Sequence, residues 1–239
     1  GRAGDGDRPL FTAISLVTCK LGKTDLALDA EALSQAAAIR PGWHPQLWSV
    51  DQAARVSFLL ASVVADTGAE QFAARLGQLC DTADMGELVA FYQGLPLYPA
   101  QPQYKARAAE GIRTNMRSVF EAVAHRNPYP SEQLEERPWN QMVLKAIFVG
   151  STLHPVVGLD ARANVDLTRM LCDYAQERWS AGRVVSPELW RCVALAADER
   201  ALACLRRAMD GEDALGATGA ALAIAGSDTD AVRVVLDEY

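Results

Sequence analysis

Hydrophobic residues recur at three- and four-residue steps along almost the whole chain, whereas alternation over the length of a strand is hard to find. This spacing places apolar side chains on one face of a helix. The pattern therefore predicts an all-α protein. Residues 10–21 are the one ambiguous segment, because their β-branched side chains suit a strand, a helix or an extended segment packed on helices.

Helix start signals are plentiful in the first half of the chain. Residues able to cap a helix precede three of the predicted helices: Asp29, Ser49 and Asp84. The last two are each followed three residues later by Gln or Glu, as in a capping box. The proline-rich stretch 96–102 is the best candidate for a boundary inside the chain.

Three longer segments follow this boundary. The spacing predicts one long helix over 104–125, stopped by Asn127-Pro-Tyr-Pro130. Pro138 suits the first turn of a helix that reaches residue 149, and Asp160 suits the cap of a helix that reaches Gly182. The apolar stripe of the long helix comprises Ile112, Met116, Val119, Phe120 and Val123.

Shorter Ala- and Leu-rich helices are predicted at 199–209, 212–225 and 228–238, separated by two-residue turns. This texture is typical of HEAT-type hairpins. We therefore expect stacked antiparallel helical hairpins, either a HEAT- or TPR-like solenoid or an irregular helical array. The predicted organisation is a flexible leader at 1–9, a helical domain at 10–197 and C-terminal helices at 198–239 packed on the same domain.

Composition narrows the classes of protein. The 239 residues are 50% hydrophobic, enough for a buried core, and their formal charge is −7. That charge argues against nucleic acid or an anionic membrane as the main partner. No apolar run reaches the length of a membrane span. The five cysteines lack Cys-x-x-Cys spacing, so we expect buried free thiols in a reducing cytoplasm.

Two familiar catalytic patterns fail in this chain. Gly22-Lys23-Thr24 resembles the end of a phosphate-binding P-loop, but that motif requires glycine at position 17, where Val17 stands. No Gly-x-Ser-x-Gly elbow is present. His44 is expected in a surface turn before Pro45.

Polar residues interrupt the apolar pattern in the middle of the chain. Glu121 and His125 stand four residues apart, so on one helix they share a face and could form an acid–base pair or bind a metal. His154, Asp160 and Asn164 could add ligands from a neighbouring segment. The usual metal-ligand spacings are missing, so no cofactor is predicted, with a metal held through Glu121, His125 and His154 as the alternative.

Other polar residues lie close to predicted apolar faces. Arg113 and Asn115 are expected to need buried partners, unlike Arg107, Glu110 and Arg117, for which solvated ion pairs are expected. On the next helix, Asn140 and Lys145 lie beside residues that demand burial, and a desolvated lysine could act as a base or hold an anion. Trp139 is the tryptophan expected nearest a pocket.

Seven stretches in order resemble the EboA-domain family. They are Trp48–Val56, Phe91–Leu97, Arg113–Asn115 with Phe120–His125, Asn127–Pro130, Trp139–Lys145, Gly158–Asn164 and Asp173–Trp179. The resemblance covers roughly residues 10–193. It implies a bacterial protein of secondary metabolism, encoded beside enzymes such as a prenyltransferase and linked to the export of metabolite precursors. It supplies no catalytic residues, only the expectation that the matched stretches line whatever site exists.

Two functions follow from this sequence. The first is binding, and transformation, of a small polar metabolite, phosphorylated or prenylated, in a cleft between helices 104–125 and 138–149. His125, Glu121 and Lys145 are its candidate catalytic residues. The candidate ligand-binding residues are Arg113, Asn115, Asn127, Tyr129, Trp139, Asn140, His154, Asp160 and Asn164. The second function is a helical adaptor, without chemistry, for other enzymes of the same pathway.

Overall fold

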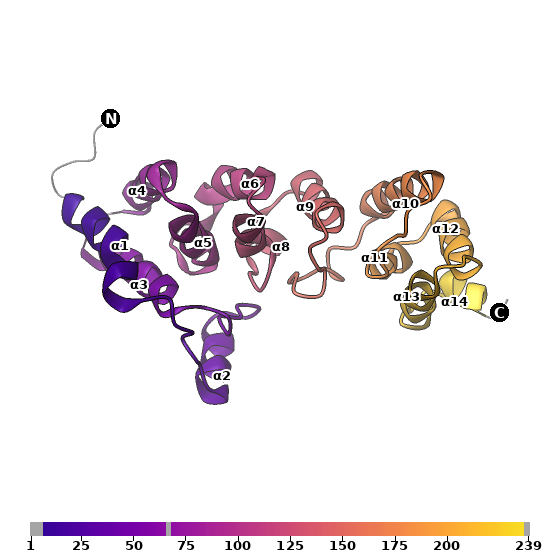
Figure 1. Cartoon of the computed structure of the whole chain (residues 1–239), viewed down its shortest axis with the longest axis horizontal. Coiled ribbons are helices and arrows are strands. Elements are labelled where there is room, and N and C mark those ends of the chain that lie inside the picture. The colour runs from indigo at the N-terminus through magenta and orange to yellow at the C-terminus, as the bar shows by residue number, and fades with distance from the viewer. Residues whose placement is uncertain (1–6, 66–67, 237–239) are drawn as a thin grey trace. The chain divides into compact units, whose positions relative to one another are not determined.

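The computed structural model describes residues 7–65 and 68–236, and within them the chain forms fourteen α-helices and two short 3-10 helices (Figure 1). The same residues form no β-strand; one isolated bridge joins Asp25 and Ser49. The all-α prediction is confirmed. The chain divides into two compact units, residues 1–135 and 136–239, which are described separately below.

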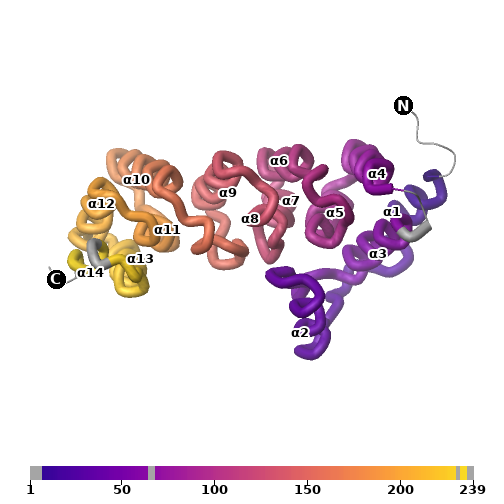
Figure 2. Tube along the Cα trace, turned by 180° about the vertical axis from the view of Figure 1, so that it is seen from behind, coloured from indigo at the N-terminus to yellow at the C-terminus, as the bar shows by residue number. Residues whose placement is uncertain are grey.

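The first unit holds the helices coloured indigo to magenta in Figures 1 and 2. Its elements are α1 (Arg8–Leu21), α2 (Ala30–Ile39), α3 (Val50–Ala65), α4 (Ala69–Thr82), α5 (Met85–Gln93), η1 (Leu95–Leu97), η2 (Gln101–Tyr104), α6 (Lys105–Arg113), α7 (Arg117–Ala124) and α8 (Tyr129–Gln133). Helix α3 packs on α1 and α5, and α7 packs on α5 and α6. This chain of helix pairs forms the core of the unit.

The ambiguous segment at the start of the chain is helical. Pro9 lies in the first turn of α1, where a missing N–H costs nothing, and Ile14 and Val17 are buried. The helix begins at Arg8, inside the stretch predicted as a flexible leader, and Asp7 pairs with Arg75 of α4 at 2.7 Å. That prediction is wrong for residues 7–9, and residues 1–6 lie outside the described part of the chain.

Thr18 of α1 is hydrogen-bonded to a buried ion pair within α3, formed by Asp51 and Arg55. Arg55 Nη1 donates to Asp51 Oδ2 at 2.8 Å, Thr18 Oγ1 donates to the same oxygen at 2.8 Å, and Arg55 Nη2 donates to Thr18 Oγ1 at 2.8 Å. Ser49 Oγ donates to Asp51 Oδ1 rather than capping α3, so only half of the predicted capping box forms, through Gln52. The capping box predicted at Asp84 is complete: Asp84 Oδ1 accepts from Glu87 N at 2.8 Å, and Glu87 Oε2 accepts from Asp84 N at 3.0 Å.

The single helix predicted over 104–125 is wrong. The chain breaks between α6 and α7, where Thr114 is extended and its Oγ1 accepts a hydrogen bond from Met116 N at 3.2 Å. Such a side-chain turn competes with the helix ladder. The break lets α7 fold back on α6, so Ile112, Val119, Phe120 and Val123 are buried as expected, while Met116 is exposed.

Helix α2 lies apart from the other helices of its unit in both views (Figures 1 and 2). Asp29 caps it through Ala32 N, as predicted, and only Ala36 of the helix is buried. Arg40 anchors its end by donating to Pro96 O at 2.9 Å and pairing with Glu132. The proline-rich stretch therefore packs inside the first unit, and the boundary between units follows Glu135 instead.

The second unit contains α9 (Glu136–Phe148), α10 (Val165–Ser180), α11 (Leu189–Leu195), α12 (Glu199–Met209), α13 (Ala214–Ala225) and α14 (Asp230–Leu236). Helix α12 has the predicted bounds, and α13 packs on α11 and α12. Asp160 does not cap α10; the cap is Asn164, whose Oδ1 accepts from Leu167 N at 2.8 Å. Asp160 lies one turn too early, among the turns that precede the helix.

The five cysteines are free thiols. Four are buried, as predicted, and Cys19 is exposed on α1. Burial raises the pKa of Cys80 and of Cys192 to about 12, so both thiols are neutral at physiological pH.

Candidate functional site

Glu121 and His125 line a cavity of about 180 Å³ in the first unit. The walls come from the turn between α2 and α3, the end of α5, helix α7 and the segment that follows it. The lining residues are His44, Leu47, Trp48, Gln93, Ser118, Glu121, Ala122, His125, Arg126 and Asn127. The predicted pair thus faces a hollow, and two of the three histidines meet there.

The turn that carries His44 is tied to the segment that carries His125. His44 N donates to Arg126 O at 3.2 Å. In the orientation that satisfies both ends of its amide, Gln46 donates to His44 O at 2.8 Å and accepts from Arg126 Nε at 3.0 Å. Arg126 has a φ of +53°, a left-handed conformation that costs free energy in a non-glycine residue. These bonds hold the segment in that conformation, beside the cavity.

His125 caps the C-terminus of α7. Its backbone N–H donates to Glu121 O at 2.8 Å, and the Glu121 carboxylate accepts from Arg117 Nε at 2.8 Å. Both Glu121 and His125 are half-buried. Glu121 and His125, predicted as a pair from their spacing, therefore both line the cavity. Arg117 already donates a hydrogen bond to the Glu121 carboxylate.

Asn127 and Tyr129 are bound internally. Asn127 Nδ2 donates to Tyr92 O at 3.0 Å and to Ala122 O at 3.1 Å, and its Oδ1 accepts from Tyr129 N at 3.0 Å. Tyr129 is fully buried and its hydroxyl donates to Gln101 O at 2.6 Å; burial raises its pKa. These bonds favour a structural role for Asn127 and Tyr129, and Asn127 also forms part of the cavity wall.

Gln93 is a cavity residue that motif reasoning missed. It lies at the end of α5, and its Oε1 is buried without a hydrogen-bond partner among the described residues. A buried acceptor without a partner costs free energy. The available signal was the stretch Phe91–Leu97, which contains Gln93 and contributes to the family resemblance.

Arg113 and Asn115 do not meet the buried partners expected for them. Arg113 ends α6, Asn115 lies in the break before α7, and both are exposed. The break moves them out of the helical register in which they would have bordered the apolar stripe. Neither lines the cavity of Glu121 and His125.

The remaining candidates belong to the second unit. Asn140 and Asn164 exchange amide hydrogen bonds of 3.0 and 2.9 Å, and Asn164 also caps α10. Asn140 is buried, so this pair fastens α9 to the start of α10. The two amides use each other, which favours a structural role for both.

Trp139 and Lys145 both lie on α9. Trp139 is fully buried, and the Arg162 guanidinium stands over its ring at 5.0 Å from the centroid. Its indole N–H has no hydrogen-bond partner in the described part of the chain. Burial lowers the pKa of Lys145, as expected for a lysine near an apolar face.

His154 and Asp160 are exposed in the turns after α9. The backbone N–H of His154 donates to Glu188 Oε1 at 3.1 Å. Asp160 receives two hydrogen bonds from Arg191, at 2.7 and 2.6 Å. Within residues 7–65 and 68–236, no group of three or more His, Cys, Asp or Glu could hold a metal ion.

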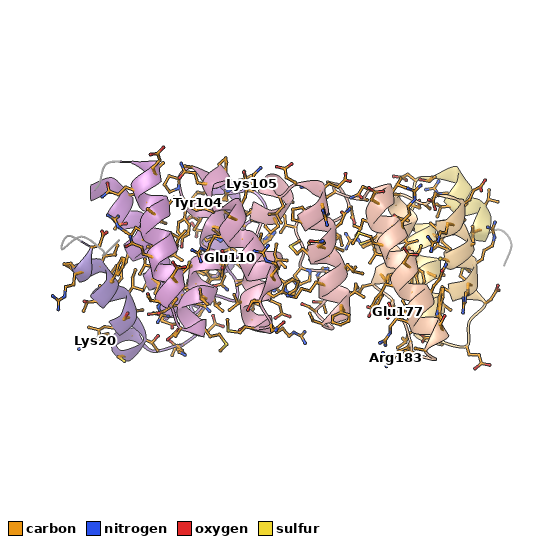
Figure 3. All side chains as sticks on the ribbon, turned by 90° about the horizontal axis from the view of Figure 1, so that it is seen from above. Lys20, Tyr104, Lys105, Glu110, Glu177 and Arg183 are labelled. Atoms are coloured by element: carbon orange, nitrogen blue, oxygen red, sulfur yellow. The ribbon has the colours of Figure 1, made fainter. Side chains whose placement is uncertain are left out.

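A charged cluster on α6 is paired internally. Arg107 donates to Asp81 Oδ1 at 2.9 Å and pairs with Glu110 Oε2 at 2.8 Å. Figure 3 locates Glu110 on α6 by its label, together with Tyr104 and Lys105 at the start of that helix. This arrangement agrees with the solvated ion pairs expected from the sequence, and it leaves the histidine cavity as the better candidate site of this unit.

A family model described as metabolite traffic protein EboA matches residues 2–194. The chain belongs to the EboA family. Membership supports a function related to metabolites. No curated protein and no solved structure matches the chain significantly.

Every residue that lines the histidine cavity lies within the EboA match, and helices α12–α14 follow it. Among the described residues of this EboA chain, none of the helices has both the length and the apolar character needed to cross a membrane.

Proposed function

We propose that this EboA-family protein binds a small polar metabolite in the cavity between His44 and His125, through a phosphate or carboxylate group. One observation carries the proposal. Two histidines from distant parts of the chain line one cavity, and hydrogen bonds tie together the backbone segments that carry them. Two backbone segments that are already tied together cost less entropy on binding than two that must first be brought together.

The chemistry of the lining suits an anionic group, because the one carboxylate there, Glu121, already pairs with Arg117. Imidazoles donate hydrogen bonds, and the Arg126 guanidinium is a permanent cation at the same cavity. Gln93 adds an amide whose Oε1 has no partner within the described residues, so a ligand hydroxyl would relieve it. The family description as a metabolite traffic protein supports a metabolite as the ligand.

The volume limits what can enter. A cavity of about 180 Å³ corresponds to about six water molecules at roughly 30 Å³ each. It accommodates a phosphate or carboxylate with a few further atoms. The proposed occupant is therefore a small metabolite or the polar head of a larger one.

The proposal concerns binding. Glu121 already accepts a hydrogen bond from Arg117, and Lys145 belongs to the other compact unit. Catalytic roles for His125, Glu121 and Lys145 stay predictions, and so does the alternative of a helical adaptor.

Methyl phosphate is a suitable first probe, because it offers the head group alone. We expect dose-dependent amide shifts around the cavity in an NMR titration, with methanol causing none. His125→Ala and His44→Ala should each weaken binding at least tenfold while the protein stays folded. Methyl acetate should not compete, whereas acetate should.

Gln93→Leu and Gln103→Leu form a matched pair. Gln93 lines the cavity, whereas Gln103 is an exposed residue of η2. We expect weaker binding only for Gln93→Leu, without a loss of thermal stability, because the substitution removes an acceptor that lacks a partner. If His44→Ala, His125→Ala and Gln93→Leu all bound methyl phosphate as tightly as wild type, the proposal would be overturned.

A further inference from the structure

A second cavity, mostly apolar, lies between α2 and α3 in the first unit. Its volume is about 310 Å³. The lining residues are Leu26, Leu28, Ala32, Gln35, Ala36, Ile39, Trp43, Pro45, Trp48, Ala53, Val56, Ser57, Leu60 and Leu97. Only two of these residues, Gln35 and Ser57, carry uncharged polar side chains other than an indole, and none is charged.

Trp48 lines both cavities. Its side chain is 7% exposed, and its ring meets that of Trp43 edge to face. The polar cavity of His44 and His125 and the apolar cavity under α2 therefore adjoin each other at Trp48.

Packing between helices does not cover the apolar side of α2. Ile39 is 78% exposed although it lines the cavity, and Ala36 is the one buried residue of this helix. Exposed apolar surface beside a hollow is a common sign of a binding site. The hydrogen bonds of Arg40 hold the end of the helix in place, so the cavity is a formed feature of the fold.

We infer that the ligand is a small amphiphile, whose phosphate or carboxylate head lies between His44 and His125 and whose aliphatic tail lies in the cavity under α2. This inference rests on the proposed function, because it takes the polar cavity as the head-group site. The tail would contact Leu28, Ile39 and Val56, where each buried methylene gains free energy from leaving water.

The apolar cavity favours a hydrocarbon chain as its occupant, because none of its lining residues is charged and it adjoins the polar cavity at Trp48. At roughly 30 Å³ for each water-sized group, about ten such groups fit within it. A tail of about eight to ten carbons matches the space.

Octyl phosphate and methyl phosphate test the inference, since they share a head and differ in the tail. Both are titrated by NMR into the full chain, with octyl phosphate kept below its micelle concentration. We expect octyl phosphate to bind at least tenfold more tightly, and 1-octanol alone to bind more weakly than octyl phosphate.

Ala32→Phe and Ala37→Phe provide the matched variants on α2. Ala32 lines the cavity, whereas Ala37 is exposed and does not line it. Ala32→Phe should fill the tail site and remove the tenfold advantage of octyl phosphate while methyl phosphate binds as before. Ala37→Phe should leave both affinities unchanged.

The outcomes separate the two levels of the argument. Equal binding of octyl and methyl phosphate by the wild type would overturn the amphiphile and keep the polar site. An advantage of octyl phosphate that survives Ala32→Phe would place the tail elsewhere and also overturn the inference. Failure of both phosphates to bind would overturn the proposed function itself.

Discussion

The indole rings of Trp43 and Trp48 meet edge to face, with centroids 5.4 Å apart and planes inclined by 73°. This contact orders the turn between α2 and α3, which also carries His44. Because Trp48 forms part of the wall of both cavities, the packing of the turn and the geometry of the candidate site depend on the same side chain.

Replacing Trp48 should therefore affect stability and binding together. We expect Trp48→Ala to lower the free energy of unfolding by about 3–5 kcal/mol, as for other buried aromatic residues, and to abolish the binding of methyl phosphate. Urea denaturation and NMR titration measure the two effects. Trp43→Phe keeps an aromatic edge and removes an indole N–H that has no partner in the described residues, so it should change stability by less than about 1.5 kcal/mol.

Gly111 is required where α6 crosses α7. A Cβ there would lie 2.7 Å from Val123 Cγ2 and 2.9 Å from the Tyr92 ring. Gly111→Ala should destabilise the protein by about 1–3 kcal/mol through overpacking.

Gly77→Ala is the control for this effect, because the nearest atom to its added Cβ is a flexible Arg107 nitrogen at 3.6 Å. In the interior of α4 this change should stabilise by about 0.5–1 kcal/mol. Thermal unfolding of both variants tests the sign difference; a loss of stability in Gly77→Ala comparable to that in Gly111→Ala would contradict the packing argument.

The buried pair of Asp51 and Arg55 should be costly to break. Asp51→Asn leaves Arg55 charged and buried, so we expect a loss of about 3–5 kcal/mol. Asp81→Asn removes one of the two carboxylate partners of Arg107, at an exposed position, and should cost no more than about 1 kcal/mol. Chemical denaturation distinguishes the two, and similar losses would mean that burial does not decide the cost.

The same pair gives a dependence on pH. Burial opposes ionisation of Asp51, but hydrogen bonds from Ser49, Thr18 and Arg55 outweigh it and lower the pKa below the ordinary 3.8. The unfolded chain binds the proton more readily, so the stabilisation is complete above about pH 3.8 and is lost as pH falls through the folded pKa. Asp51→Asn should show a shallower loss of stability below pH 3.8 than wild type; identical slopes would refute this assignment.

Asn164 should prove structural. Asn164→Ala removes the cap of α10 and leaves the buried Asn140 amide without its partner, which together cost about 2–4 kcal/mol. Asn115→Ala, at an exposed position, should change stability by less than about 0.5 kcal/mol. A stable Asn164→Ala variant would return Asn164 to the candidates for ligand binding.

The helices were predictable where a local signal defines them. Asp29 and Asp84 cap their helices through contacts three residues away, and that spacing is visible in the sequence. The break at Thr114 was missed, because a Thr-Asn pair is tolerated in a helix and the turn is favoured here by the packing of α7 on α6. The choice of Asn164 over Asp160 as a cap likewise depends on a distant partner, Asn140.

The candidate site was predictable in part. The spacing of Glu121 and His125 placed them on one face, and both line the cavity. The sequence predicts only a surface turn for His44, which is where it lies, because nothing local reveals that this turn is hydrogen-bonded to Arg126. Asn127 and Tyr129 are polar and lie in a matched stretch, so the sequence predicts them as ligand residues, but their polar atoms are satisfied inside the fold.

The three histidines allow the most direct test of the central claim. In NMR spectra of side-chain nitrogens from protein labelled with ¹⁵N-histidine, methyl phosphate should shift His44 and His125 along one binding curve and leave His154, an exposed residue of the other unit, unmoved. Shifts of His154 alone, equal shifts of all three, or shifts of none at saturating methyl phosphate would contradict the proposed site.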